Sequence, residues 1–293
     1  MQTKFGRMFP FLKRGKVGEN ILLTGIPRSG TTLACRLLCN FGQTVALNEP
    51  LDRQLFGNPR VAQQNIKKQG QIFRTSLLCD GTALARTQAG KLTDNAYSPD
   101  TTQRERIVAR SAIAFNKPLE RDFTLVMKHC AEFTLLLPAL AAEFSVYALI
   151  RNPLAILASW ASVNVPVSRG QVAKSARLNP AFHAALSRQG DDLLQRQLFI
   201  LSWYFGQYND FSPNRLLRYE DLVQDPAGVL APLAQGELSE PFATLQSKNT
   251  SALYDKAQLH SRGEALLRSS GHYWRYYSRE VVGELLQQMT KDA

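Results

Sequence analysis

The stretch from Asn20 to Phe41 constrains the fold of this chain more than any other. "NILLTG" (Asn20 to Gly25) is a short apolar run bounded by turn residues, which is typical of a buried strand. After a short loop, apolar residues recur at helical spacing from Gly30 to Phe41, and Gly42 ends the pattern. A strand, a tight glycine loop and a helix in this order indicate an α/β fold.

Several further segments continue this alternation. Short apolar runs predict strands, and apolar residues at helical spacing predict helices between them. The strands are expected at Gln43 to Leu47, Phe123 to Lys128, Ser145 to Ile150 and Asn214 to Tyr219, and two of the helices at Leu154 to Val163 and Leu193 to Phe205. We therefore predict a P-loop-type three-layer fold with a central, mainly parallel sheet flanked by helices and a site at the carboxyl ends of the strands.

Length and composition favour one domain. The 293 residues are 44% hydrophobic, enough for one large core. We expect a single domain over 1–293, with 1–18 as a flexible N-terminal tail and 51–119 as a helical insertion that shapes a pocket together with 165–191. The longest apolar run, Phe133 to Ala142, is too short to cross a membrane. Four cysteines without a C-x-x-C pair favour a reducing, cytoplasmic location.

The glycine loop is nearly a Walker A motif, G-x-x-x-x-G-K-[ST], but it lacks the lysine. Gly25 and Gly30 have the right spacing, and Thr31 stands at the lysine position. Glycine lets the backbone approach an anion closely, and the helix N-terminus offers free N–H groups and the positive end of the helix dipole. The loop therefore predicts an anion site, formed by Arg28, Ser29, Gly30, Thr31 and Thr32.

Two other predicted strands end in cations. The run "FTLVMK" ends in Lys128, and "SVYALI" leads directly into Arg151. A nucleoside-triphosphate enzyme needs an acid at such a strand end to hold Mg²⁺, and "LLCDG" with Asp80 is the one weak match. An ATP-dependent small-molecule kinase stays open as the alternative, but a metal site is not expected.

Four motifs resemble those of sulfotransferases that use 3′-phosphoadenosine 5′-phosphosulfate (PAPS). "PRSGTT" (Pro27 to Thr32) is similar to their 5′-phosphosulfate loop, and "IRNPLAILAS" (Ile150 to Ser159) to their 3′-phosphate motif. "RYEDLVQDP" (Arg218 to Pro226) and "HYWRYYS" (His272 to Ser278) match more loosely and in the same order. The resemblance covers most of the chain and favours the bacterial or Golgi-type enzymes of this family.

The resemblance implies how the donor is held. PAPS has no γ-phosphate for a Walker lysine, and its 3′-phosphate needs a cation and a hydroxyl elsewhere, roles that fall to Arg151 and Ser159. Tyr219, in the third motif, is assigned to the donor site as well. Cytosolic members also carry an Arg-Lys-Gly element, for which Arg262 and Gly263 are only a partial counterpart.

The resemblance also implies the reaction. Arg28 and Lys128 are expected to stabilise negative charge in a loose transition state without a metal. A hydroxyl or amine acceptor must lose a proton, and Glu49 in "LNEP" is the preferred general base. His129 is the rival, although it follows Lys128 directly, where cytosolic members place their histidine two residues after the lysine.

The charge of +11 permits an anionic ligand without identifying one. The basic residues are scattered rather than clustered with aromatics, so a nucleic-acid-binding module is disfavoured. "NTS" (Asn249 to Ser251) is a formal glycosylation sequon that arises often by chance. We expect a small-molecule or carbohydrate acceptor, whose identity the sequence does not reveal.

Overall fold

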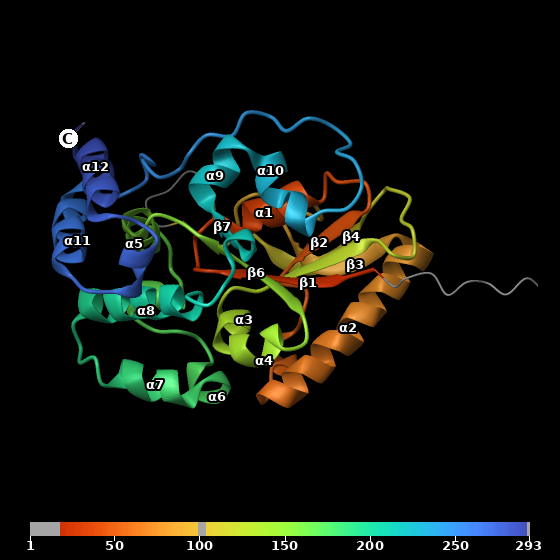
Figure 1. Cartoon of the computed structure of the whole chain (residues 1–293), viewed down its shortest axis with the longest axis horizontal. Coiled ribbons are helices and arrows are strands. Elements are labelled where there is room, and N and C mark those ends of the chain that lie inside the picture. Colours follow the sequence, from red (N-terminus) through yellow and green to blue (C-terminus); the bar gives the residue numbers. More distant parts are fainter. Residues whose placement is uncertain (1–17, 99–103, 292–293) are drawn as a thin grey trace, which may run out of the picture.

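The computed structural model describes residues 18–98 and 104–291, so the tail predicted over 1–18 lies almost wholly outside the described residues. At its centre is a parallel sheet of five strands in the order β2-β5-β1-β6-β7 (Figure 1). The strands are β1 (Asn20–Gly25), β2 (Thr44–Asn48), β5 (Thr124–Lys128), β6 (Ser145–Ile150) and β7 (Leu216–Arg218). β1 lies between β5 and β6 and runs parallel to both. The chain therefore leaves these three strands at the same edge of the sheet.

Apolar side chains cover both faces of the sheet, as a parallel sheet requires. In β1, Ile21 and Leu23 pack on one face and Leu22 on the other, which follows from the two-residue period of a strand. The first face is covered by α1 (Thr31–Leu38), α9 (Tyr219–Gln224) and α10 (Pro226–Leu230). The second face is covered by α2 (Pro59–Asp80), α3 (Ala131–Leu135) and α4 (Leu137–Ala141) (Figure 1). The predicted three-layer α/β fold is thus confirmed.

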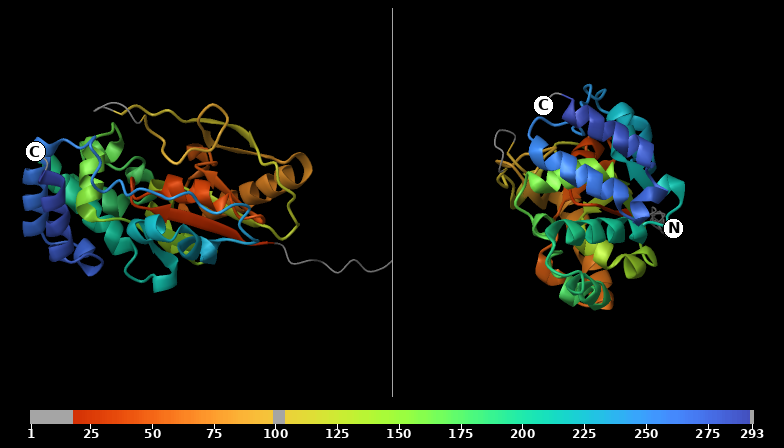
Figure 2. Two further views of the ribbon diagram at one scale, coloured as in Figure 1. Left: turned by 90° about the horizontal axis from the view of Figure 1, so that it is seen from above. Right: turned by 90° about the vertical axis from the view of Figure 1, so that its left-hand side faces the viewer.

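The apolar core on the second face extends beyond the sheet into a group of helices at one end of the molecule. Helix α5 (Pro153–Ala161) begins with Asn152 as its N-cap and Pro153 in its first turn, and it is buried over almost its whole length. Around it lie α8 (Leu193–Gln207), α11 (Lys256–Arg268) and α12 (Arg279–Thr290). In both Figure 1 and Figure 2 these C-terminal helices and α2 occupy opposite ends of the long axis.

The insertion over 51–119 is only partly helical. Helix α2 starts at the N-cap Asn58 and stops at Gly81, whose left-handed backbone (φ 65°) suits a helix end. An antiparallel pair that the sequence did not reveal follows, β3 (Thr82–Thr87) with β4 (Ala109–Ala114). Asp80 of "LLCDG" is an exposed residue at the end of α2 and does not follow a strand.

The remaining short elements connect these parts. They are α6 (Ser175–Leu178), α7 (Pro180–Ser187) and the 3₁₀ turns Arg53–Leu55, Pro166–Arg169, Pro213–Arg215, Ala231–Leu233 and His272–Arg275. Within the described residues, no helix combines the length and the apolar composition that crossing a membrane requires.

Candidate functional site

The glycine loop between β1 and α1 is held in one shape by its neighbours. Gly30, at the N-cap of α1, has a φ of 97°, and a Cβ on it would lie 2.6 Å from Cδ2 of Tyr219. Any side chain here would therefore be both strained and obstructed. The Trp160 indole donates to the Pro27 carbonyl (2.8 Å), and the Ser29 hydroxyl donates to the Leu149 carbonyl (2.8 Å).

This loop borders a cavity of about 870 Å³. Arg28, Gly30, Thr31 and Thr32 all line it, as predicted for an anion site, and the N-terminus of α1 opens toward it. Ser29 does not line it, because its buried side chain is turned toward β6. The structure therefore does not bring Ser29 to the cavity, in contrast to its predicted place in the anion site.

Arg28, Arg151 and Ser159 meet at one end of the cavity. The Arg28 Nε donates to the Ser159 hydroxyl (3.1 Å), and both its terminal nitrogens lie 3.3 Å from Oδ1 of Asn95. Arg151 donates to the Arg28 carbonyl (3.1 Å). All three residues line the cavity, although they come from the loop, the end of β6 and helix α5.

Arg28 is the most perturbed of these groups. Its backbone has a φ of 76°, which is uncommon for a residue with a side chain, and its guanidinium stacks 4.8 Å from the ring centre of Tyr97. Burial, followed by the nearby charge of Arg104, lowers the pKa of Arg28 from 12.5 to about 10. Arg28 remains a cation at neutral pH, and a bound anion would stabilise its charge.

Arg151 is fixed by a second set of contacts. Its guanidinium lies 4.4 Å from the ring centre of Tyr219, and it donates to Oδ1 of Asn249 (2.7 Å) and to the Tyr254 hydroxyl (3.2 Å). Tyr219 in turn accepts from the backbone N–H of Lys248 (2.9 Å) and lines the cavity. Asn249, the sequon residue, is thus engaged in the site.

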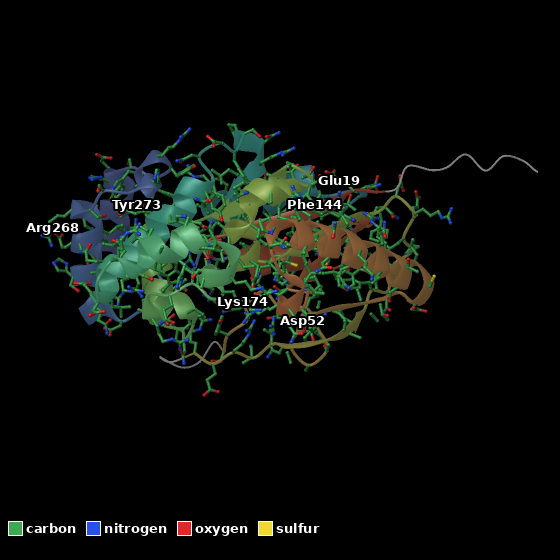
Figure 3. All side chains as sticks on the ribbon, turned by 90° about the horizontal axis from the view of Figure 1, so that it is seen from below. Glu19, Asp52, Phe144, Lys174, Arg268 and Tyr273 are labelled. Carbon is green, nitrogen blue, oxygen red and sulfur yellow. The ribbon has the colours of Figure 1, made fainter. Side chains whose placement is uncertain are left out.

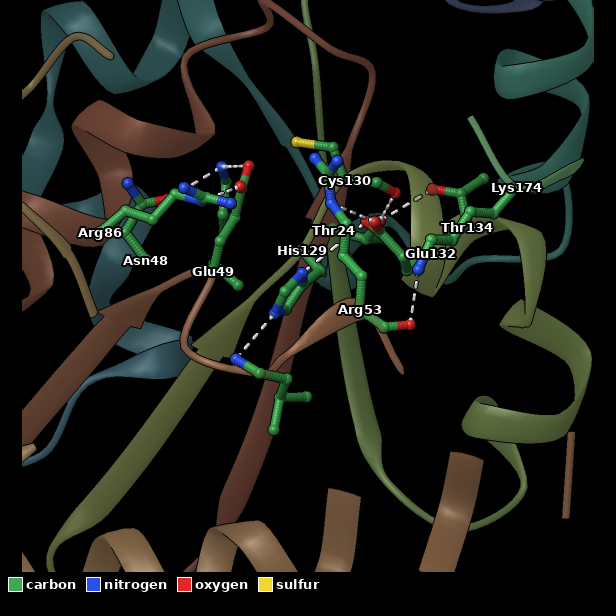
Figure 4. A network of polar contacts seen from close by, with 12 residues as sticks. Thr24, Asn48, Glu49, Arg53, Arg86, His129, Cys130, Glu132, Thr134 and Lys174 are labelled. Carbon is green, nitrogen blue, oxygen red and sulfur yellow. Dashed lines mark hydrogen bonds and ion pairs between the residues drawn. The ribbon is translucent and has the colours of Figure 1, made fainter. Parts of the chain in front are cut away.

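The other end of the cavity holds Glu49 among cations (Figure 4). One carboxylate oxygen lies 3.5 Å from Lys128 Nζ, and the other lies 2.7 Å from Arg86 Nε and 3.0 Å from Arg106 Nη2. Lys128, buried at the end of β5, also donates to Oδ1 of Asn48 (3.0 Å). Like Arg28, Glu49 has a positive φ, 44°.

These cations decide the charge state of Glu49. Burial alone would raise the pKa of its carboxyl group, but Lys128, then His129, Arg106 and Arg86 together hold it well below the ordinary value of 4.5. Burial also disfavours the charge on Lys128, yet the Cys130 thiol and the Glu49 carboxylate beside it raise its pKa. Both groups are therefore charged at neutral pH.

His129 lies behind this site rather than in it. Its ring packs between Phe56 and Phe133, and it does not line the cavity. Nε2 accepts from the backbone N–H of Leu51 (3.2 Å), and Nδ1 lies 3.7 Å from Oε2 of Glu132 (Figure 4). The ring thereby supports the chain just after Glu49.

Glu132 is a buried carboxylate at the cavity wall that the sequence did not reveal. It lies 3.3 Å from Arg53 Nε as well as near His129. Burial alone would raise its pKa, but His129 holds it below the ordinary value. Its position after a strand-end Lys-His pair was the only available signal.

The segments 51–119 and 165–191 meet at this end of the cavity. Lys174 donates to the Arg53 carbonyl (2.8 Å), and Figure 3 shows Lys174 and Asp52 on the same side of the molecule. The cavity wall here is largely apolar and includes Val165, Pro166, Val167, Val172 and Ala173.

Arg262 and Gly263 lie elsewhere. Arg262, on α11, donates to Oε1 of Gln197 (2.8 Å), and the site of a Cβ on Gly263 is occupied by Leu286 of α12. Neither residue lines the cavity. They serve helix packing in this structure, and the partial sequence match does not bring them to Arg151.

Comparison with known proteins gives only distant structural matches. No protein-family model matches the chain, and no curated protein matches it. A sulfotransferase from Mycobacterium tuberculosis aligns at 15% identity over 95% of this chain and 78% of its own, with a TM-score of 0.34. A sulfotransferase domain from the curacin biosynthetic pathway aligns at 14% over 94% and 96% (TM-score 0.38). A sulfotransferase domain from the Synechococcus PCC 7002 olefin synthase aligns at 13% over 92% and 94% (TM-score 0.35).

Proposed function

We propose that this chain is a sulfotransferase that moves the sulfonate group of PAPS to a hydroxyl or amine of an acceptor. The observation that carries the proposal is one cavity lined by two groups of residues that suit an anion. A lysine-free glycine loop lines it, and Arg151 and Ser159 lie beside that loop rather than within it. A donor with one phosphosulfate and one distant phosphate has this distribution of charge.

The donor groups are assigned to the residues as follows. The 5′-phosphosulfate binds to the backbone of the loop and to the hydroxyls of Thr31 and Thr32, at the N-terminus of α1. The 3′-phosphate binds to Arg151 and Ser159, and Tyr219 fixes the Arg151 guanidinium by stacking. Arg28 bonds to Ser159 in this structure, so it serves the phosphate end as well as the loop.

The transfer breaks the bond between sulfur and the bridging phosphate oxygen and forms a bond between sulfur and the acceptor oxygen or nitrogen. The phosphate keeps the electron pair, and the acceptor proton passes to a base. Lys128, buried at the end of β5, stabilises the charge that grows during transfer, and its low exposure strengthens this interaction.

Glu49 is the proposed base. Its carboxylate is ionised at neutral pH and lines the cavity, so it is ready to accept a proton. The same low pKa makes it a weak proton acceptor while Arg86 and Arg106 hold it. We therefore propose that the acceptor loosens these two contacts when it binds, which raises the basicity of Glu49 at the moment of transfer.

A kinase fits these residues less well. Lys128 and Arg151 stand at the strand ends where a triphosphate enzyme places the acid for its Mg²⁺, and Asp80 lies at the end of α2, away from the cavity. The apolar wall formed by 165–173 suits a small-molecule or carbohydrate acceptor. Four free cysteines fit a reducing compartment, and we propose a cytoplasmic location.

Thermal unfolding tests the donor. Adenosine 3′,5′-bisphosphate, the desulfonated donor, should raise the melting temperature without Mg²⁺, because a ligand that binds only the folded state stabilises it. ATP with Mg²⁺ should raise it much less. The reverse ranking would favour the kinase. A screen of alcohols, amines, phenols and sugars with labelled PAPS then identifies the acceptor.

A further inference from the structure

The arginines of the cavity fall into two groups. Near Glu49 and Glu132, each cavity arginine has a carboxylate: Arg106 pairs with Glu49 and Arg53 with Glu132. At the other end, Arg28, Arg104 and Arg151 form no ion pair with any carboxylate in residues 18–98 and 104–291. Within the described residues, three guanidinium groups that form no ion pair thus share one end of the cavity.

Arg104 is the member of this group that the sequence did not reveal. The residue is 7% exposed, and it comes from the insertion rather than from a strand end or the glycine loop. Its backbone N–H donates to the Ser162 carbonyl (3.2 Å), and its Nε donates to the Ser98 carbonyl (2.7 Å). These contacts dock Arg104 on the C-terminal end of α5, three residues after Ser159.

The three guanidinium groups also act on one another. The charge of Arg104 is the largest influence after burial among those that lower the pKa of Arg28, and Arg151 adds to it. The Tyr254 hydroxyl, which accepts from Arg151, is also close enough to Arg104 to influence its charge. Buried like charges repel, so an anion that binds among the three guanidinium groups would relieve their repulsion.

We propose that Arg104 is a third ligand of the donor's 3′-phosphate, a cation that binds beside Arg151 and Ser159. This inference rests on the proposed function. It assigns to Arg104, in the insertion, the additional 3′-phosphate contact that Arg262 does not make. A phosphate dianion with three acceptor oxygens can take hydrogen bonds from several guanidinium groups at once.

Two nucleotides that differ only in the 3′-phosphate test the proposal by isothermal titration calorimetry. Arg104→Ala should lower the affinity for adenosine 3′,5′-bisphosphate about tenfold or more and leave the affinity for adenosine 5′-monophosphate nearly unchanged. Only the bisphosphate carries the 3′-phosphate that Arg104 is proposed to contact. Arg104→Lys, which keeps the charge but not the fork of donors, should fall between. The affinity ratio within one variant cancels any loss of folded protein.

Arg110→Ala is the matched control. Arg110 lies on the same insertion and pairs at the surface with Asp52, outside the cavity, so its removal tests the effect of net charge alone. It should leave the ratio unchanged. Equal losses for both nucleotides in Arg104→Ala, or no loss, would overturn the role of Arg104. A wild-type protein that binds neither nucleotide would overturn the proposed function itself.

Discussion

The Arg28 guanidinium and the Ser159 hydroxyl are joined by a hydrogen bond of 3.1 Å between residues 131 positions apart. It links the glycine loop to helix α5 inside the cavity, where the 3′-phosphate is proposed to bind. A ligand at this point contacts both elements at once.

Ser159→Ala should therefore lower the affinity for adenosine 3′,5′-bisphosphate by about tenfold, since a hydrogen bond to a charged group contributes about 1.5–3 kcal/mol. The melting temperature should change little, because Arg28 keeps its contact with Asn95. Ser162→Ala is the control: Ser162 lies one turn later, outside the cavity, and donates to the Ser159 carbonyl. If both variants bind the nucleotide equally well, Ser159 is not a ligand.

Glu49→Gln keeps the shape of the side chain but removes the proton acceptor. Turnover with an alcohol acceptor should fall by roughly 10²–10⁴, while affinity for adenosine 3′,5′-bisphosphate stays nearly intact. Glu132→Gln, at the second cavity carboxylate, is the comparison. Single-turnover rates are measured for both variants. A larger loss of rate in Glu132→Gln than in Glu49→Gln would assign the role of base to Glu132.

The stability contributed by Glu49 should depend on pH. Its pKa is depressed in the folded state, so the unfolded chain binds the proton first and the contribution is present at neutral pH. Below about pH 4.5 the wild type should lose stability from this source by up to about 1.4 kcal/mol per pH unit.

Urea unfolding between pH 6 and pH 3 measures this slope. Glu49→Gln should be less stable than wild type at pH 6, and the gap should narrow as the pH falls. Glu143→Gln, at an exposed ion pair with Lys67, should follow the wild-type slope. A gap for Glu49→Gln that stays constant with pH would mean that its carboxylate is not stabilised by the surrounding cations.

The sequence predicted the strands well because their signals are local. β1 and β6 have the predicted bounds, and Lys128 and Arg151 stand at strand ends on the same edge of the sheet. The antiparallel pair β3–β4 was missed, since the polar stretch around it shows little alternation.

Long-range docking accounts for most of what the sequence did not reveal about the site. Arg104 reaches the cavity only because its backbone pairs with the end of α5, beside Val163, a contact with no local signature. Arg262 matched a short motif, but the packing of α11 turns it toward Gln197. For His129 the two-residue period of a strand was informative, because a neighbour of Lys128 points to the opposite face.

Two substitutions of His129 distinguish support from proton transfer. His129→Gln can place an amide oxygen near the position of Nε2 and keep the bond from Leu51, whereas the shorter Asn cannot. As a supporting residue, His129 should tolerate Gln with most of its turnover, and Asn should lower turnover and stability together. Two variants that unfold like wild type but are equally inactive would instead identify His129 as the base.

Tyr204 and Tyr208, four residues apart at the end of α8, should respond oppositely to loss of their hydroxyls. Both side chains are buried, and the Tyr208 hydroxyl bonds to Thr134 (2.8 Å). Tyr204 borders the cavity, but its buried hydroxyl has no hydrogen-bond partner within the described part of the chain. Tyr208→Phe should reduce the free energy of unfolding by about 0.5–1.5 kcal/mol, because a hydrogen bond is lost and Thr134 loses a partner. Tyr204→Phe should leave it unchanged or raise it, since an unsatisfied hydroxyl is removed from a buried position. Urea unfolding of the two variants at neutral pH measures the difference, and a larger loss for Tyr204→Phe would show that its hydroxyl is satisfied in solution, for instance by a bound water in the cavity.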